Sequence, residues 1–213
     1  MSPGEDFSRF AKIISEEHLP ALANNLKRIP DFTWLIDIPH AELERLQGDV
    51  LSNFPTVFLD EQGAPRSREF TVLVLNNTCD LPDGRLDFIT AAPIVDFNKY
   101  LEFERDRQLR GKNGLEDSER RRLEDRLQEF GRVLRNNDKT EILYLPPFSE
   151  FTHGALVLLH LVCSVSAKLY HEALGRGRRV ASFTQTGFYF LLIKLTTHLA
   201  RAETSEVARA NGV

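Results

Sequence analysis

Two stretches rich in strand-forming residues are separated by a stretch dominated by charged side chains. Residues 48–94 and 140–183 contain runs of β-branched and aliphatic residues, whereas residues 102–135 contain 10 basic and 9 acidic side chains. Short apolar runs bounded by turn residues are typical of strands, and a charged stretch with a narrow apolar stripe is typical of exposed helices. The sequence therefore predicts a β unit that is interrupted by a helical insertion.

The first β-rich stretch predicts a β-meander. Residues 48–60, GDVLSNFPTVFLD, predict one or two strands, and residues 61–68 predict a turn. Residues 69–77, EFTVLVLNN, predict the clearest strand of the chain, because their nearly continuous apolar core indicates burial on both faces. The Asp83-Gly84 pair predicts a tight turn before a return strand at 86–94.

The charged stretch predicts a helical hairpin, inserted at about 96–137. One apolar stripe recurs at spacings of 4, 3 and 4, as expected where a helix packs along one seam. Its members are Leu123, Leu127, Phe130 and Leu134. The simplest interpretation is two solvated helices with many i,i+4 ion pairs, which need not bind polyanions.

The second β-rich stretch predicts short strands and a closing helix. Strands are expected at 140–147 and 179–183, with a short helix, SAKLYHEAL, before the last of them. The apolar run at 154–165 fits a strand or a helix, and we favour a strand up to about residue 162. Residues 184–203 are apolar on nearly all sides, which predicts a mostly buried helix.

These elements predict an α+β protein built around one domain. The expected arrangement is an N-terminal helical extension over 1–47, a β domain over 48–203 that carries the inserted hairpin, and a frayed tail over 204–213. Short strands, frequent turns and one late apolar helix favour a small, partly open β-barrel that is closed by the C-terminal helix.

Composition narrows the classes of function. The chain has 213 residues and a formal net charge of −4, which argues against a general nucleic-acid binder but leaves room for a local basic face. Two cysteines, Cys79 and Cys163, make neither a disulfide framework nor a zinc site. The start MSPGEDFSRF does not resemble a signal peptide, and no apolar run reaches membrane-spanning length. We expect a cytoplasmic protein that does not engage a membrane.

The end of the 69–77 strand carries the densest polar cluster, which has two interpretations. The first is a pocket or catalytic patch, with Asp80 as a base or phosphate-facing acid and Cys79 as a thiol. The second is turn chemistry, because Asn and Asp side chains readily cap local backbone groups. The cluster consists of Asn76, Asn77, Thr78, Cys79 and Asp80.

Basic side chains gather in three turns. If the barrel forms, they could line one rim and contact phosphates without base specificity; the alternative is solvated surface turns. No interleaved aromatic residues of the kind that stacks bases are evident in these turns. The arginines are Arg66, Arg68, Arg85, Arg176, Arg178 and Arg179.

Signatures of metal and cofactor sites are missing. The spacing of Asp80, Asp83 and Asp87 does not match a calcium-binding loop, so we expect no metal there. His160 lies in an apolar run and is expected to be a core or boundary residue. No nucleotide-binding loop, zinc spacing or hydrolase motif occurs, so no cofactor is expected.

Four segments in order carry a further pattern: GDVLSNFPTVFLD; FTVLVLNNTCDL; LDFITAAPI; and ALVLLHLVCSVSAKL with RVASF and the apolar helix. Together they resemble the PemK/MazF group of SH3-like barrels, which are bacterial toxins that cleave RNA. The first segment is like the family's opening Gly-Asp strand, the second like its apolar strand that ends in a polar turn, the third like the next barrel strand, and the fourth like its closing elements. The likeness covers roughly residues 48–95 and 140–200.

The resemblance implies where chemistry would lie. The family places an arginine directly before its apolar strand, where this chain has Phe70 and, further back, Arg68 and Arg66. A hydroxyl or acid near the end of the later strand would correspond to Thr90. Asn76, Asn77, Cys79, Arg85 and Arg178 would be binding residues around a catalytic set formed by Arg66, Arg68, Asp80 and Thr90.

Two functions follow as hypotheses. The first is a non-catalytic PemK/MazF-like interaction module of a bacterial toxin–antitoxin or defence system, which binds a partner protein or forms a homodimer. The alternative is a metal-independent endoribonuclease that acts on single-stranded RNA. The absence of the family's arginine and the acidic net charge favour the first.

Overall fold

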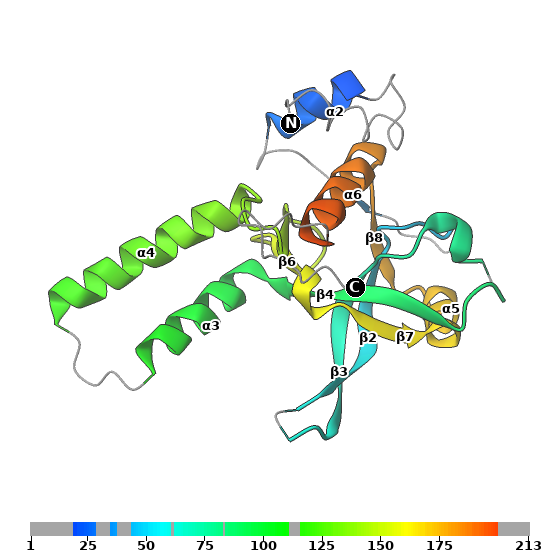
Figure 1. Ribbon diagram of the computed structural model, residues 1–213, viewed down its shortest axis with the longest axis horizontal. Coiled ribbons are helices and arrows are strands. Elements are labelled where there is room, and N and C mark those ends of the chain that lie inside the picture. Colours follow the sequence, from blue (N-terminus) through cyan, green and yellow to red (C-terminus); the bar gives the residue numbers. More distant parts are fainter. Residues whose placement is uncertain are drawn as a thin grey trace, which may run out of the picture.

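The computed structural model of the chain describes residues 19–28, 35–37, 44–60, 62–82, 84–110 and 116–199 (Figure 1). The strands are β1 (Leu35–Asp37), β2 (Val50–Leu59), β3 (Pro65–Val74), β4 (Phe88–Asp96), β5 (Ile142–Leu145), β6 (Ala155–Leu158), β7 (Cys163–Ser166) and β8 (Arg179–Phe183). The α-helices are α2 (Leu19–Leu26), α3 (Phe97–Leu109), α4 (Asp117–Arg135), α5 (Ala167–Gly175) and α6 (Gln185–Leu199). Two 3-10 turns are η1 (Thr78–Asp80) and η2 (Leu159–Leu161).

The eight strands form one antiparallel sheet that stays open. Seven follow the order β1-β8-β2-β3-β4-β6-β5, and β7 pairs with β4 beside β6. Within the described part of the chain, the end strands β1 and β5 do not pair with each other. The predicted α+β class is therefore confirmed, with an open antiparallel sheet.

The strand β4 organises the curvature of the sheet. Its residues 94–96 pair with β6 and its residues 88–91 pair with β7. Because β6, η2 and β7 follow one another, they line one edge of β4 as a single interrupted strand. Residues of β7 also approach β2, and α5 packs against β2, β4 and β7, so the sheet curls around that helix.

The inner halves of β2 and β3 are buried on both faces. Val50 and Leu73 face one core cluster, which also receives Leu191 of α6. Leu51 and Val72 face a second cluster, which contains Tyr170 of α5 and Ile89 of β4. This confirms the prediction of burial on both faces for Val72, Leu73 and Val74, whereas the flanking residues 69 and 77 are exposed.

Two local predictions were wrong at their boundaries. The expected turn at 61–68 is shorter, since β3 begins at Pro65 and pairs there with Leu59. The expected end of a strand at about 162 is an η2 turn, after which β7 continues to Ser166. The neighbouring strand β2 extends β3 within their hairpin, whereas β7 is extended by pairing with β4, which lies far away in sequence.

The predicted charged helical hairpin is present and projects from the sheet (Figure 1). Asp96 caps α3 by accepting a hydrogen bond from the Lys99 backbone N–H at 2.9 Å, and α4 begins with a Glu116–Glu119 capping box. The buried stripe of α4 consists of Leu123, Leu127, Gly131 and Leu134, so Gly131 takes the place expected for Phe130, which is half-buried.

Asn137 and Lys194 fasten the base of this hairpin. Asn137 has a positive φ of 61°, and its Oδ1 accepts a hydrogen bond from the Tyr144 backbone N–H at 2.7 Å. The Nζ of Lys194, on α6, donates to the Asn137 carbonyl at 2.5 Å. Burial lowers the pKa of Lys194 to about 8, although the nearby Glu141 and Asp138 carboxylates oppose this shift.

The N-terminal part of the chain joins the same body. β1 pairs with β8, and Leu22 of α2 packs with Tyr189 of α6. Of the helical extension predicted over 1–47, residues 1–18, 29–34 and 38–43 lie outside the described residues, as does the tail from 200 onward, and residues 44–46 are not helical, contrary to the prediction. None of the described helices combines the length and apolar character needed to cross a membrane.

Lys194→Met is expected to change the pH dependence of stability. The unfolded-state amine titrates near 10.5 and the folded-state amine near 8, so between these values the unfolded chain holds a proton that the folded chain has lost. The Lys194 contribution to the free energy of unfolding therefore rises with pH through this interval. Urea unfolding across it should show this rising component for wild type and for Lys168→Met, an exposed control, but not for Lys194→Met. An unchanged pH slope in Lys194→Met would contradict the assignment.

Candidate functional site

The polar loop after β3 uses its side chains to hold its own backbone. The Asn76 side chain accepts a hydrogen bond from the Thr90 backbone N–H, and Asn77 Oδ1 accepts one from the Cys79 N–H at 3.1 Å. The Oγ1 of Thr78 accepts from the Gln47 N–H at 3.1 Å. These contacts support the turn-chemistry interpretation of the cluster.

The other candidates at this end of β3 are exposed. Asp80 and Cys79 lie on the surface of η1, and Arg85 Nη1 donates to the Cys79 carbonyl at 2.7 Å. Thr90 lies in β4 opposite Ser164 and is half-buried. The structure therefore brings Asn76 to Thr90 and Arg85 to Cys79.

The remaining arginines lie elsewhere. Arg66 and Arg68 belong to the outer half of β3, and six residues of strand separate Arg68 from Val74, or about 20 Å. Arg178 precedes β8 and donates to the Asn53 carbonyl at 2.5 Å. A cation that stabilises a reacting phosphate must lie next to the base that acts on the same nucleotide. The set Arg66, Arg68, Asp80 and Thr90 is not assembled in this way.

The outer part of the β2–β3 hairpin forms a two-stranded projection, here named the β-arm (residues 55–60 and 62–70; Figure 1). Its register pairs Phe58 with Arg66, Thr56 with Arg68, and Phe54 with Phe70. Because side chains alternate along a strand, these pairs share one face. We name the outer part of it, Phe58, Arg66, Arg68 and Phe70, the Arg–Phe face.

The Arg–Phe face corrects one prediction. Aromatic residues do interleave with arginines here: the Arg68 guanidinium lies 5.2 Å from the centroid of the Phe70 ring. Phe58 is 46% exposed, and Val57, on the opposite face, is 61% exposed. The phenylalanines and arginines occupy alternate positions on either side of the turn in the sequence, but only the register of the hairpin shows that Phe58 lies beside the arginines.

Asp60 reduces the positive charge of this face. Arg66 Nε donates to Asp60 Oδ2 at 2.8 Å, and Asp60 Oδ1 accepts from the Ala64 N–H at 2.8 Å and the Gln62 N–H at 3.0 Å. The Ala64 N–H, followed by the Arg66 guanidinium, lowers the pKa of Asp60, so the carboxylate stays ionised. Arg66 is therefore paired with a negative charge at the tip of the β-arm.

Sequence reasoning missed a buried ion pair between Asp49, directly before β2, and Arg179 of β8. Arg179 was expected in a surface turn, but it is 7% exposed and its Nη1 donates to Asp49 Oδ2 at 3.1 Å and to the Glu44 carbonyl at 2.8 Å. Asp49 is fully buried and also accepts from the Leu46 N–H at 3.1 Å. The only local signal for this ion pair in the sequence is the Gly48-Asp49 dipeptide. Gly48 has a φ of +93°, and a Cβ there would collide with the Phe183 ring, so this position requires glycine.

This buried group lies against α5. Burial raises the pKa of Asp49, while the Leu46 N–H and the Ser182 hydroxyl, together with the Arg179 charge, favour the ionised form. Burial and the nearby Asp49 charge likewise raise the pKa of Tyr170 on α5. Because Asp49 and Tyr170 are inaccessible to solvent, we assign the group to stability rather than to chemistry.

No cluster of histidine, cysteine, aspartate and glutamate residues in the described part of the chain could hold a metal ion. Cys79 is exposed, and burial raises the pKa of Cys163, whose thiol faces the Ala91 carbonyl at 3.5 Å. No protein-family model matches the sequence, and no curated protein is significantly similar to it.

Arg179→Met should destabilise the protein by about 3–5 kcal/mol, because it leaves the Asp49 carboxylate buried without its cation. The double variant Asp49→Leu/Arg179→Met should recover much of this loss, since neither charge then remains in the core. Urea unfolding measures both. Arg176→Met is the matched control, because Arg176 is exposed and its ion pair with Glu172 is long, at 3.6 Å. The free energy of unfolding of this variant should stay near the wild-type value. A similarly small effect of Arg179→Met would contradict the account.

Proposed function

We propose that the protein is a non-catalytic interaction module whose contact surface is the β-arm. One observation carries this proposal: the candidate arginines and the candidate acid lie at opposite ends of β3, while the arginines share an exposed face with Phe58. Such an arrangement suits recognition better than catalysis.

The chemistry of the β-arm favours a protein partner over RNA. Exposed aromatic residues and arginine are enriched in the centres of protein interfaces, where they often dominate binding energy. Asp60 neutralises Arg66, and the net charge of the whole chain is −4, so attraction of a phosphate backbone is weak. Val57, on the opposite face, would also be covered if a partner enclosed the β-arm.

The family and cellular setting extend this proposal. A partly open SH3-like barrel of the PemK/MazF type that has lost the reaction but kept a partner is compatible with the open, curled sheet. Membership of a bacterial toxin–antitoxin or defence system, with a cytoplasmic location, belongs to this proposal and rests on the sequence resemblance. The competing hypothesis, an endoribonuclease that uses Arg66, Arg68, Asp80 and Thr90, gains no support from their placement.

Pure protein is expected to leave single-stranded and structured RNA intact in metal-free buffer. The reason is the separation of Arg68 from Asp80 along β3. Gel analysis of end-labelled RNA measures cleavage, with Arg68→Ala and Asp80→Ala as controls for a contaminating nuclease. Cleavage by wild type that disappears in both variants would overturn the proposal in favour of the endoribonuclease.

A photo-crosslinking residue at position 58 should form a specific protein adduct in cells of the native host. The same residue at position 168, where exposed Lys168 lies on α5, is the matched control and should form none. Arg68→Glu should abolish the adduct at position 58, because it reverses the charge beside the contact. An adduct with RNA alone, or equal adducts at both positions, would contradict a protein contact at the β-arm.

A further inference from the structure

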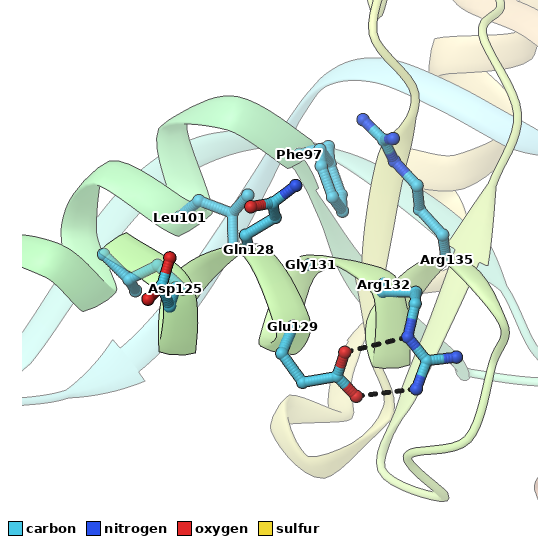
Figure 2. A pocket seen from close by; sticks show the side chains of 9 residues that line it. Phe97, Leu101, Asp125, Gln128, Glu129, Gly131, Arg132 and Arg135 are labelled. Atoms are coloured by element: carbon cyan, nitrogen blue, oxygen red, sulfur yellow. Dashed lines mark hydrogen bonds and ion pairs between the residues drawn. The ribbon is translucent and has the colours of Figure 1, made fainter. Parts of the chain in front are cut away.

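A shallow groove runs along one side of the helical hairpin, and nothing in the proposed function uses it. Figure 2 shows its inner part, where Phe97 and Leu101 of α3 face Gly131 of α4. A Cβ on Gly131 would lie 3.4 Å from Leu101 and 3.5 Å from Phe97, which is ordinary van der Waals contact, so the floor of the groove is closely packed here. We name this surface the charged groove.

The charges along the α4 wall of the groove are segregated. Asp125 and Glu129 lie toward the outer end of the hairpin, and Arg132 and Arg135 lie toward its base (Figure 2). On the α3 wall, Glu102 adds to the acidic part, and the Arg105–Glu124 ion pair at the outer end is neutral. The groove is thus acidic in its outer part and basic at its base.

The helix dipole accounts for only part of this pattern. The dipole favours basic residues in the last turn of a helix, and this explains the positions of Arg132 and Arg135. That effect fades within the first and last turns, and Asp125 lies two turns inside a 19-residue helix. The dipole therefore does not account for Asp125, whereas Glu129 is already paired with Arg132 within α4.

We propose that the charged groove binds the same groove of a second copy of this chain, with the two α4 helices antiparallel. A two-fold axis near residue 130 would place Asp125 opposite Arg135 of the partner subunit and Glu129 opposite the other basic residue, Arg132 of the partner subunit. The same contacts are repeated on the other side of the axis, as a two-fold interface requires. Each acidic half then meets a basic half, which no parallel pairing achieves.

Contacts within one copy leave these side chains available. Glu129 and Arg132 form a bidentate ion pair within α4, at 2.6 and 2.9 Å, and a contact between copies must share or exchange this pair; both side chains are exposed, at 58% and 62%, so they can also reach a second copy. The Arg135 guanidinium lies 4.6 Å from the centroid of the Phe97 ring, which holds it at the base of the groove. Pairing between copies therefore requires little rearrangement.

The size of the surface predicts a weak dimer. A two-fold axis near residue 130 overlaps residues 125–135 of the two α4 helices, which is about 16 Å of helix, and two helices side by side are about 20 Å wide, so the footprint is about 320 Å² per copy. Two such footprints reach about 640 Å², below the size of stable specific interfaces, so the contact is a transient one. Association should therefore depend strongly on protein concentration. The groove is separate from the β-arm, so this dimer does not depend on the proposed function.

Sedimentation velocity over a range of concentrations tests the proposal with two charge-reversal variants. Arg132→Glu/Arg135→Glu makes the groove wholly acidic, and Asp125→Arg/Glu129→Arg makes its wall basic. Each variant alone should dimerise at least about tenfold more weakly than wild type, because attractive pairs become repulsive. An equal mixture of the two should restore a dimer, since complementary charges then face each other.

Two control variants separate this contact from others. Arg120→Glu/Arg121→Glu makes the same charge change on α4 outside the groove and should dimerise like wild type. Phe58→Ser should also leave the dimer intact. Loss of the dimer in this variant would show that the β-arm joins the copies instead. Wild type that stays monomeric, or a mixture of the reversal variants that fails to associate while both remain folded by circular dichroism, would overturn the proposal.

Discussion

Burial of the inner halves of β2 and β3 on both faces is the constraint on which the rest of the molecule depends. Each face receives its own cluster, with α6 over one and α5 over the other. The Asp49–Arg179 ion pair then ties β2 to β8 inside this core. With these inner halves fixed, the same two strands extend outward as the β-arm, which is largely exposed because no other element of the described ranges covers it. One hairpin thus supplies both the centre of the fold and its main exposed projection.

The second projection, the helical hairpin, is anchored by different means. Phe97 and Leu134 pack with β5 and β6, and Lys194 holds the turn that follows α4. Both projections are therefore packed against the core at their base, and most of their length is exposed to solvent. Two anchored projections that carry exposed charged and aromatic side chains are the kind of surface that an interaction module requires. They differ in chemistry, since the β-arm offers aromatic and arginine groups, whereas the groove offers complementary charge.

Features that depend on local sequence were predictable, and features that depend on distant pairing were not. The strand at 69–77 and the stripe through Leu123 and Leu127 follow from local periodicity, and both are confirmed. The continuation of β7 beyond η2 depends on pairing with β4, which no local pattern reveals. Arg179 looked like one of three equivalent turn arginines, because its burial depends on a carboxylate 130 residues away. The candidate site was limited in the same way: Phe58 and Arg66 were visible individually, but their shared face required the hairpin register.

The separation of Arg68 from Asp80 is the central claim, because it distinguishes a recognition surface from an assembled nuclease site. Electron–electron double resonance between spin labels on cysteines introduced at positions 68 and 80, with Cys79 and Cys163 replaced by serine, measures it directly. The account predicts one distance population at about 20 Å or beyond, set by the length of strand between the two positions. A dominant population far shorter than this, with or without RNA, would show that the two residues meet and would contradict the account.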